Sequence, residues 1–313
     1  MPKVSVIVPV YRTEAFIARC AESLFGQTLE DIEYIFVDDA SPDRSMEVLD
    51  AVLEKFPERK ASVIRYRMDA NSGQAAVRLK GLSLATGDYV IQCDSDDRVE
   101  PDAYRRLYEK AVSENLDIVT CDSRRGNDAG WKTVRQHYEP GKELSSLLLG
   151  NASWSLCFRL VRRSLYDAPL IEPVSDMGED MVLTLQTTFR AKKCGHLAEP
   201  LYYYYIHAAS TTGRPDRDSC IARWKAVKAN VDRMLVFLCG EAGFSAEDPE
   251  IVAFKYHIRR YLEPLLGEAE GYRLWRETYP ETDRLLLKAR GIPVKRKLLY
   301  LMMRCRLPVY RKK

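Results

Sequence analysis

The chain has eight cysteines but no C-x-x-C pair. Its first apolar segment is not preceded by a leader in which charged residues are followed by an apolar run. This pattern indicates reduced thiols in a cytosolic protein. Long apolar runs are missing as well: the stretch at 298–303 has six residues, against the ~20 that a helix needs to span a bilayer. The sequence therefore predicts a cytoplasmic protein.

The familiar phosphate-binding loops are also absent. No G-x-G occurs anywhere in the chain, and no G-x-x-x-x-G-K-[ST] occurs either. The glycines of these motifs let a backbone approach a phosphate group closely. The sequence therefore gives no support to a dinucleotide-binding protein of the G-x-G-x-x-G type or to a P-loop nucleotide hydrolase.

Acidic residues are missing from the C-terminal end. After Asp283 the chain has eleven basic residues and no acidic one, whereas residues 1–283 carry the other 37 of the 48 basic residues against all 45 acidic ones. The tail at 295–313 combines these cations with Leu298, Leu299, Leu301 and Met302. We expect it to lie on an anionic membrane surface. The alternative is a helix packed on the protein with a solvated basic end; nucleic acid is not expected, because an interleaved aromatic pattern is lacking.

Apolar segments rich in β-branched residues alternate with amphipathic segments along the first 122 residues. Expected strands lie at 3–11, 33–39, 61–67, 88–94 and 117–122, and expected helices at 14–25, 41–56, 74–85 and 101–115. This alternation predicts an α/β fold with a Rossmann-like, mostly parallel sheet flanked by helices. Beyond residue 123 the pattern changes: 124–130 indicates a loop, 178–192 a helix, 201–207 a strand and 217–265 helices.

Three carboxylates, Asp94, Asp96 and Asp97, follow the expected strand at 88–94, and Asp39 ends another strand. In open sheets of this kind, ligands bind beyond the carboxyl ends of the strands. Asp94 and Asp96 would project together if the extended geometry continued that far. Two such carboxylates repel each other unless a cation lies between them, and Mg²⁺ or Mn²⁺ suits oxygen ligands. The alternative is a solvated turn, because Asp and Ser are common turn residues.

Three stretches in this order carry a family resemblance: "VSVIVPVYRTEAFIARCAESLFGQTLEDIEYIFVDDASPDRS", "NSGQAAVRLKGLSLATGDYVIQCDSDD" and "GEDMVLTLQ". Together they strongly resemble glycosyltransferase family 2, whose members are inverting enzymes of the GT-A fold. The segment "IHAASTTGR" at 206–214 is similar to the H-x-x-S-x-T segment of that family. The resemblance implies a GT-A domain at 1–214, with a nucleotide-sugar half at 1–122 and an acceptor half at 123–214. Residues 215–313 would form a helical region with a basic amphipathic tail.

The resemblance also implies a role for individual residues. The nucleotide sugar would be bound by Pro9, Tyr11, Asp39, Arg78, Asp94 and Ser95. A divalent metal would be held by Asp96 and His207, the general base would be Asp180, with Glu179 as the alternative, and Trp154 would contact the acceptor. Three departures from the family pattern are Ala40 in place of a glycine, Leu79 in place of an asparagine, and Leu156-Cys157 where the family often has a lysine.

The predicted function is transfer of one sugar from a nucleotide-diphosphate sugar, with uridine as the expected base, to a glycan or lipid-linked acceptor. The family resemblance suggests capsule, exopolysaccharide or lipopolysaccharide assembly at the inner face of a cell membrane. One alternative is a sugar nucleotidyltransferase, which would need a glycine-rich basic loop after the first strand. Another is a receiver-like signalling module built on Asp38, Asp39 and Asp94, and a third is an inactive sugar-binding relative.

Overall fold

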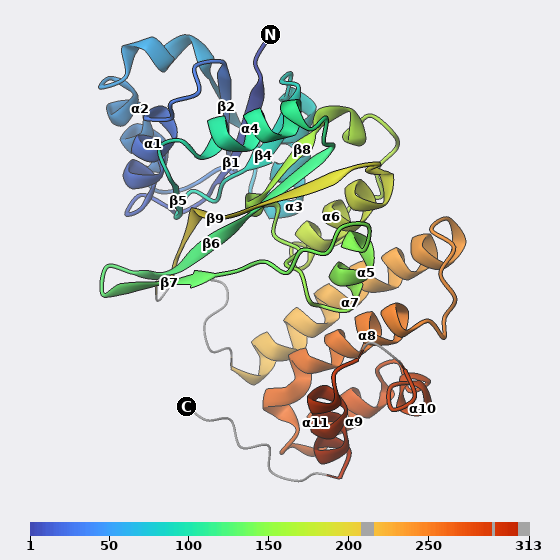
Figure 1. Cartoon of the computed structure of the whole chain (residues 1–313). Helices are drawn as coiled ribbons and strands as arrows, with labels where there is room; N and C mark the ends of the chain where they lie inside the picture. The colour runs from blue at the N-terminus through green and yellow to red at the C-terminus, as the bar shows by residue number, and fades with distance from the viewer. Residues whose placement is uncertain (208–215, 290–291, 306–313) are drawn as a thin grey trace. The chain divides into compact units, whose positions relative to one another are not determined.

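The computed structural model describes residues 1–207, 216–289 and 292–305 (Figure 1). The chain forms two compact units: the first contains residues 1–143 and 154–210, and the second contains residues 144–153 and 211–313. Most of the expected H-x-x-S-x-T segment, beyond His207, and the end of the basic tail, beyond Cys305, lie outside the described residues.

A nine-stranded sheet forms the centre of the first unit, in the order β3-β2-β1-β4-β8-β6-β9-β5, with β7 paired to β6. The strands are β1 (Val4–Val10), β2 (Ile32–Asp38), β3 (Val63–Arg67), β4 (Tyr89–Gln92), β5 (Arg98–Val99), β6 (Ile118–Asn127), β7 (Gly130–Val134), β8 (Arg159–Arg162) and β9 (Cys194–Tyr205). The first four strands in this order are parallel. Strand β8 runs antiparallel to both β4 and β6, whereas β6 and β9 are parallel. The predicted α/β class is confirmed, with a mixed sheet whose parallel part begins at β3.

Helices cover this sheet and build the second unit. In the first unit they are α1 (Ile17–Phe25), α2 (Ser45–Leu53), η1 (Pro57–Ser62), α3 (Gln74–Leu84), α4 (Ala103–Ser113), η2 (Leu156–Phe158), η3 (Arg163–Tyr166) and α6 (Glu179–Arg190). The second unit contains most of α5 (Glu143–Leu148), then α7 (Arg217–Gly240), α8 (Pro249–Arg259), η4 (Arg260–Leu265), α9 (Ala269–Glu277), α10 (Thr282–Leu285) and α11 (Val294–Arg304). None of the helices in the described residues is long and apolar enough to cross a bilayer.

Strand β1 explains why the sheet has a core on both faces. Its even-numbered residues, including Val6 and Val8, belong to a large cluster that also contains Leu24 of α1 and Leu49 of α2. Its odd-numbered Ile7 belongs instead to a smaller cluster on the α3 side. Because successive strand residues point to opposite faces, a nearly continuous apolar run is what a strand covered on both sides requires.

One predicted loop proved to be regular structure. Residues 124–130 complete β6 and turn into β7, with Asn127 opposite Gly130. The turn is closed by the amide of Ala129, which donates to the side-chain oxygen of Asn127 at 3.0 Å. An Asn-x-x-Gly turn joins two antiparallel strands well, since glycine accepts unusual backbone geometry. The composition of 124–130, with its glycine, asparagine and aspartate, predicts a loop, and the same residue types also form hairpin turns.

We predict that Gly81→Ala destabilises the protein through the contact between α3 and β1. A Cβ atom at Gly81 would lie 2.3 Å from Cγ2 of the fully buried Ile7. Overpacking of this kind costs about 1–3 kcal/mol, which exceeds the up to ~1 kcal/mol that alanine gains as a helix former. Chemical denaturation should therefore show a lower free energy of unfolding. The matched control is Gly240→Ala at the end of α7, where no atom lies within 4 Å; an equal loss in both variants would contradict this explanation.

Candidate active site

Arg78 on α3 lies at the centre of a buried set of oxygen acceptors. Its side chain is 4% exposed; Nη2 donates to Oδ1 of Asp94 at 2.8 Å and Nε donates to Oε1 of Glu179 at 3.2 Å. Nη1 donates to the amide oxygen of Gln92. Burial by itself would lower the pKa of Arg78, but the two carboxylates raise it above its usual value. Arg78 is therefore a fixed cation that connects the exit of β4 with the start of α6.

The two acids that begin α6 differ in their partners. Glu179 is buried and ion-paired to Arg78. Asp180 is partly exposed, and the hydrogen bond recorded for its carboxylate comes from the amide of the next residue, Met181, at 2.7 Å. Burial raises the pKa of both side chains, that of Glu179 to about 7 with a further contribution from the charge of Asp180. Asp180 is thus the acid of this pair that is not ion-paired to Arg78.

Asp96 and His207 form a second pair next to this cluster. His207 Nε2 lies 2.9 Å from Oδ2 of Asp96. Burial raises the pKa of Asp96, as does the nearby Asp94, whereas His207 lowers it. The His207 ring packs on Phe16 with ring centroids 4.2 Å apart, and the carbonyl of Asp96 accepts from Nη2 of Arg19 at 2.9 Å. Both members of the pair are therefore held by residues of α1 or the segment just before it.

The Asp96–His207 pair suits a divalent metal. His207 Nε2 and Asp96 Oδ2 lie 2.9 Å apart, the distance of a hydrogen-bonded pair, and a metal bound here would replace that contact. Imidazole and carboxylate are both ligands of Mn²⁺-type ions. No group of three or more His, Cys, Asp or Glu side chains able to hold a metal was found in the part of the chain that the structure describes. The remaining ligands would therefore come from water and from the phosphates of a substrate, as Mg²⁺ usually requires.

The extended geometry that would make Asp94 and Asp96 project together does not continue that far. Strand β4 ends at Gln92, and residues 94–97 form a turn in which the amide of Asp97 donates to the carbonyl of Asp94 at 3.0 Å. Asp97 is buried, and its carboxylate accepts from Tyr202 Oη at 2.6 Å and from the amide of Tyr205 at 2.7 Å. Burial and the charges of Asp94 and Asp96 raise the pKa of Asp97. Asp97 therefore fixes the turn to β9, whereas Asp94 pairs with Arg78 and Asp96 with His207.

Asp39, the residue expected to bind the nucleobase, is buried under the loop before α3. Its Oδ1 accepts from the amide of Ser72 at 2.7 Å, and its Oδ2 accepts from Asn71 Nδ2 and the amide of Gly73, both at 3.0 Å. The next residue, Ala40, has φ of 53°, a left-handed conformation that favours glycine. This geometry explains why a glycine is usual at that position.

The other expected site residues are less tightly grouped. Pro9 lies on β1 opposite Val37, Tyr11 is 39% exposed just after β1, and Ser95 is buried between Asp94 and Asp96. Trp154 lies ahead of η2, and its carbonyl accepts from Thr184 Oγ1 of α6 at 2.7 Å. The structure brings Arg78, Asp94, Asp96, Glu179 and His207 together through recorded contacts. The acceptor role of Trp154 stays a prediction.

Sequence reasoning missed two residues that shape the site. Gln92, the last residue of β4, accepts from Arg78; a polar residue at the end of an apolar strand was the available signal. Asp176 accepts from the amide of Ala75 at 3.0 Å and so caps α3 from a distant segment. Gly73 has φ of 86°, a backbone conformation that favours glycine, and a Cβ atom there would also displace the Asp176 carboxylate. No local pattern could have revealed Asp176, because its partner is 101 residues away.

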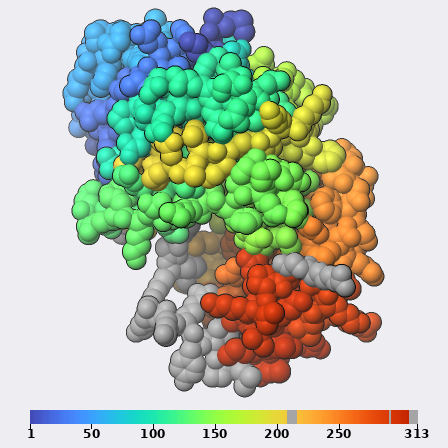
Figure 2. All heavy atoms as spheres, in the orientation of Figure 1, coloured from blue at the N-terminus to red at the C-terminus, as the bar shows by residue number. Residues whose placement is uncertain are grey.

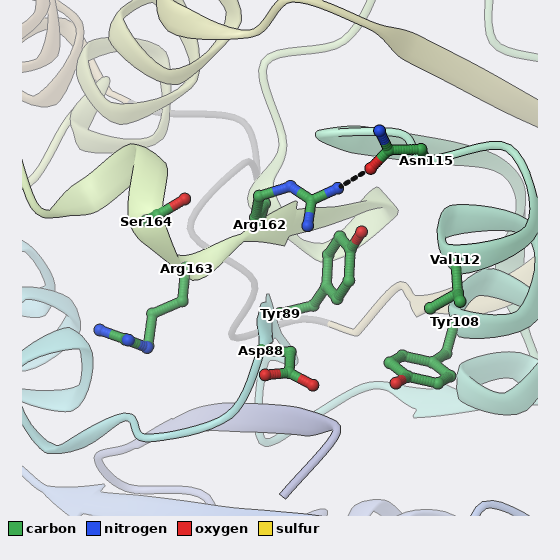
Figure 3. Close-up of a pocket in the computed structure, with 8 residues that line it drawn as sticks. All are labelled: Asp88, Tyr89, Tyr108, Val112, Asn115, Arg162, Arg163 and Ser164. Carbon is green, nitrogen blue, oxygen red and sulfur yellow. Dashed lines mark hydrogen bonds between the residues drawn. The ribbon is translucent and has the colours of Figure 1, made fainter.

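A surface pocket of about 320 Å³ lies at the opposite end of β4 (Figure 3). Tyr89, which begins β4, lines it together with Asp88, Tyr108, Val112, Asn115, Arg162, Arg163 and Ser164. Its Arg162 already donates to Asp117 at 2.9 Å and to Asn115 at 3.1 Å. Since ligands of such sheets bind at the carboxyl ends of the strands, the carboxylate cluster after Gln92, and not this pocket, is the candidate active site.

We predict that Glu179→Gln removes a pH-dependent loss of stability. A carboxyl whose pKa rises from 4.5 to about 7 on folding favours the folded state when protonated, and this advantage is lost as the pH rises through that range. The wild type should lose roughly 2–3 kcal/mol relative to the variant between pH 5 and pH 8. Denaturant titrations of both proteins at the two pH values measure this difference. A difference that does not change with pH would contradict the burial argument; the Gln amide oxygen can still accept from Arg78.

Comparison with known proteins supports the resemblance to glycosyltransferase family 2. Residues 5–168, more than half of the chain, match the model of the family described as Glycosyl transferase family 2. EpsJ, an uncharacterized glycosyltransferase of Bacillus subtilis, is 34% identical over 226 residues, which cover 69% of this chain and 64% of EpsJ. The poly(ribitol-phosphate) beta-glucosyltransferase of Bacillus spizizenii is 29% identical over 214 residues, which cover 65% of this chain and 32% of that protein. The matches to the first three curated relatives span 63% to 64% of their length, somewhat less than two thirds.

A solved structure shows the same fold. The crystal structure of S. aureus TarS residues 1–349 in complex with UDP-GlcNAc has a TM-score of 0.61 and 19% identity, and the likeness covers 89% of this chain and 92% of that one. It confirms the predicted GT-A fold. Neither a sugar nucleotidyltransferase nor a receiver-like module agrees with these matches. The chain belongs to glycosyl transferase family 2.

Proposed function

We propose that the protein transfers a single sugar from a nucleotide-diphosphate sugar to a hydroxyl group of a glycan or lipid-linked acceptor, with inversion at the anomeric carbon. The observation that carries this proposal is the convergence of Arg78, Asp94 and the Asp96–His207 pair at the carboxyl end of β4, beside the acids that begin α6. Family membership supports the reaction type. A uridine nucleotide is supported by UDP-GlcNAc in TarS.

Donor binding would use the residues around the turn at 94–97. Asp94, held by Arg78, would face the ribose, and Pro9, Tyr11 and Asp39 would line the nucleoside site. A divalent metal held by Asp96 and His207 would neutralise the negative charge that develops on the departing diphosphate. Arg78 contributes a fixed positive charge to the same region, and such preorganised charge is effective because it needs no rearrangement during the reaction.

Asp180 would act as the general base. An acceptor hydroxyl is a poor nucleophile until a base takes its proton, and a positioned carboxylate contributes typically ~10²–10⁴-fold. Glu179 is less suited to this role because Arg78 already holds it. Burial raises the pKa of Asp180, which improves its strength as a base at neutral pH. The hydroxyl oxygen then forms its bond to the anomeric carbon as the bond to the diphosphate breaks, and a single displacement inverts the configuration.

The acceptor class rests on relatives. According to its name, one relative transfers glucose to poly(ribitol-phosphate), which supports a role in capsule, exopolysaccharide or related polymer assembly for this chain. Trp154 remains the proposed acceptor contact. A location at the inner face of the cell membrane is a separate proposal that depends on α11.

We predict that Asp180→Asn lowers the rate of sugar transfer by about 10²–10⁴-fold while nucleotide binding is kept. The amide cannot accept the acceptor proton, but it is close in size to the carboxylate. Nucleoside diphosphate release from a panel of nucleotide sugars, measured with an acceptor mixture, gives the rate, and calorimetry with UDP gives the affinity. Glu179→Gln serves as the matched control on the neighbouring acid and should retain a larger share of activity. An Asp180→Asn enzyme with unchanged turnover would refute the base assignment.

We predict a different defect for Asp96→Asn. Loss of this carboxylate should weaken the Mn²⁺-dependent part of UDP binding by tenfold or more, because the metal loses a charged ligand. Calorimetric titration of UDP in the presence of Mn²⁺, and again in the presence of a chelator, measures the metal-dependent and the metal-independent affinity for UDP. If the wild type binds UDP with the same affinity with and without Mn²⁺, no metal acts at the Asp96–His207 pair. If the wild type releases nucleoside diphosphate equally from every nucleotide sugar of the panel, the proposed sugar transfer itself is contradicted.

A further inference from the structure

Helix α11 in the second unit carries an apolar stripe on its outer side. Val294, Leu298 and Leu301 are 70%, 55% and 38% exposed. They are separated by four and three positions, so they share one face of the helix. In the space-filling view, the red C-terminal part of the second unit forms part of the visible surface (Figure 2). Three neighbouring exposed apolar side chains on one helix require an explanation, because single ones are common but clusters mark contact sites.

The opposite face of α11 fixes the helix on the second unit. Tyr300 and Met303 are buried, and the Tyr300 ring stacks on Trp275 with centroids 5.8 Å apart. Arg296 donates to the carbonyl of Leu149 at 2.6 Å. The outward stripe is therefore a preformed surface of a docked helix. This differs from the sequence-based expectation, which placed Leu299 and Met302 in the contact; both are only partly exposed.

Cations border the stripe on both sides. At 100° per residue, Lys295 lies on one side of Val294, Leu298 and Leu301, while Lys297 and Arg304 lie on the other. Lys297 Nζ donates to the carbonyl of Leu287 at 2.9 Å. No acidic residue occurs in the chain after Asp283. The outer face of α11 is thus apolar along its middle and positive along both edges.

We propose that this face of α11 binds the surface of a bilayer that contains anionic phospholipid. The apolar stripe would enter the boundary between headgroups and acyl chains, and the lysine and arginine rims would meet the phosphate groups. A second copy of the chain fits less well, because a two-fold contact between two such faces brings positive rims together. Nucleic acid also fits less well, because the centre of the face is apolar and offers no contact to phosphate. This proposal does not depend on the proposed function.

The test is flotation of the full chain with vesicles of phosphatidylcholine mixed with phosphatidylglycerol, compared with vesicles of phosphatidylcholine alone. The wild type should bind the anionic vesicles, and binding should fall as salt is raised. The double variant Leu298→Asp, Leu301→Asp should bind at least about tenfold more weakly, because it removes apolar contact and adds repulsion. Lys295→Glu, Lys297→Glu should show a loss of similar size that is largest at low salt.

Matched controls come from α7 of the same unit. Val236 is 76% exposed and Lys225 is exposed, so Val236→Asp and Lys225→Glu make the same chemical changes away from α11 and should leave vesicle binding unchanged. Thermal melts establish that each variant is folded. The proposal is overturned if the wild type does not bind anionic vesicles, or if the α11 variants bind as well as the wild type. A dimer in sedimentation that dissociates in the leucine variant without any vesicle binding would assign the stripe to self-association instead.

Discussion

The candidate site depends on one buried arginine. Arg78 is held by Gln92 and Asp94 at the exit of β4 and by Glu179 at the start of α6. Glu179 is 101 residues away in sequence, so the site forms only when the early and late parts of the first unit have folded together. Removal of one partner from a buried ion pair costs about 3–5 kcal/mol, because the other charge is left uncompensated. Arg78, whose positive charge is proposed to assist the departing diphosphate, therefore also links the exit of β4 to the start of α6 through its ion pairs.

The same arrangement separates neighbouring acids into two roles. In the pair that begins α6, Arg78 holds Glu179 and leaves Asp180 outside the ion pair. In the turn after β4, Tyr202 and the backbone of β9 hold Asp97, whereas Asp94 and Asp96 pair with the side chains of Arg78 and His207. Each acidic motif thus contains a carboxylate held by long-range contacts next to one for which a functional role is proposed. Sequence alone shows adjacent acids as equivalent, and only their long-range partners distinguish them.

Local patterns predicted most of the first unit. Parallel strands buried on both faces leave an apolar run, and amphipathic helices leave a periodic one, so β1, β2, β4 and their helices could be located from residues alone. The second half of β6, strand β7 and the short strand β8 could not, since their polar or brief segments have no distinctive period. The family motif identified residues that do cluster in space, such as Arg78 and Asp96. The extended geometry expected for Asp94 to Asp96 was wrong because the strand ends at Gln92.

For α11 the sequence predicted a basic amphipathic tail but could not say which side faces outward. Apolar residues occur all round this helix, and only the packing of Tyr300 and Met303 decides the inner face. A related limit applies to Asp39, whose partners in the loop before α3 are distant in sequence. A carboxylate can accept about four hydrogen bonds, and the described contacts to Asp39 account for one on Oδ1 and two on Oδ2. Oδ1 therefore retains capacity to accept a donor from a nucleobase while the loop stays in place, so the role implied for Asp39 is compatible with its role in holding that loop.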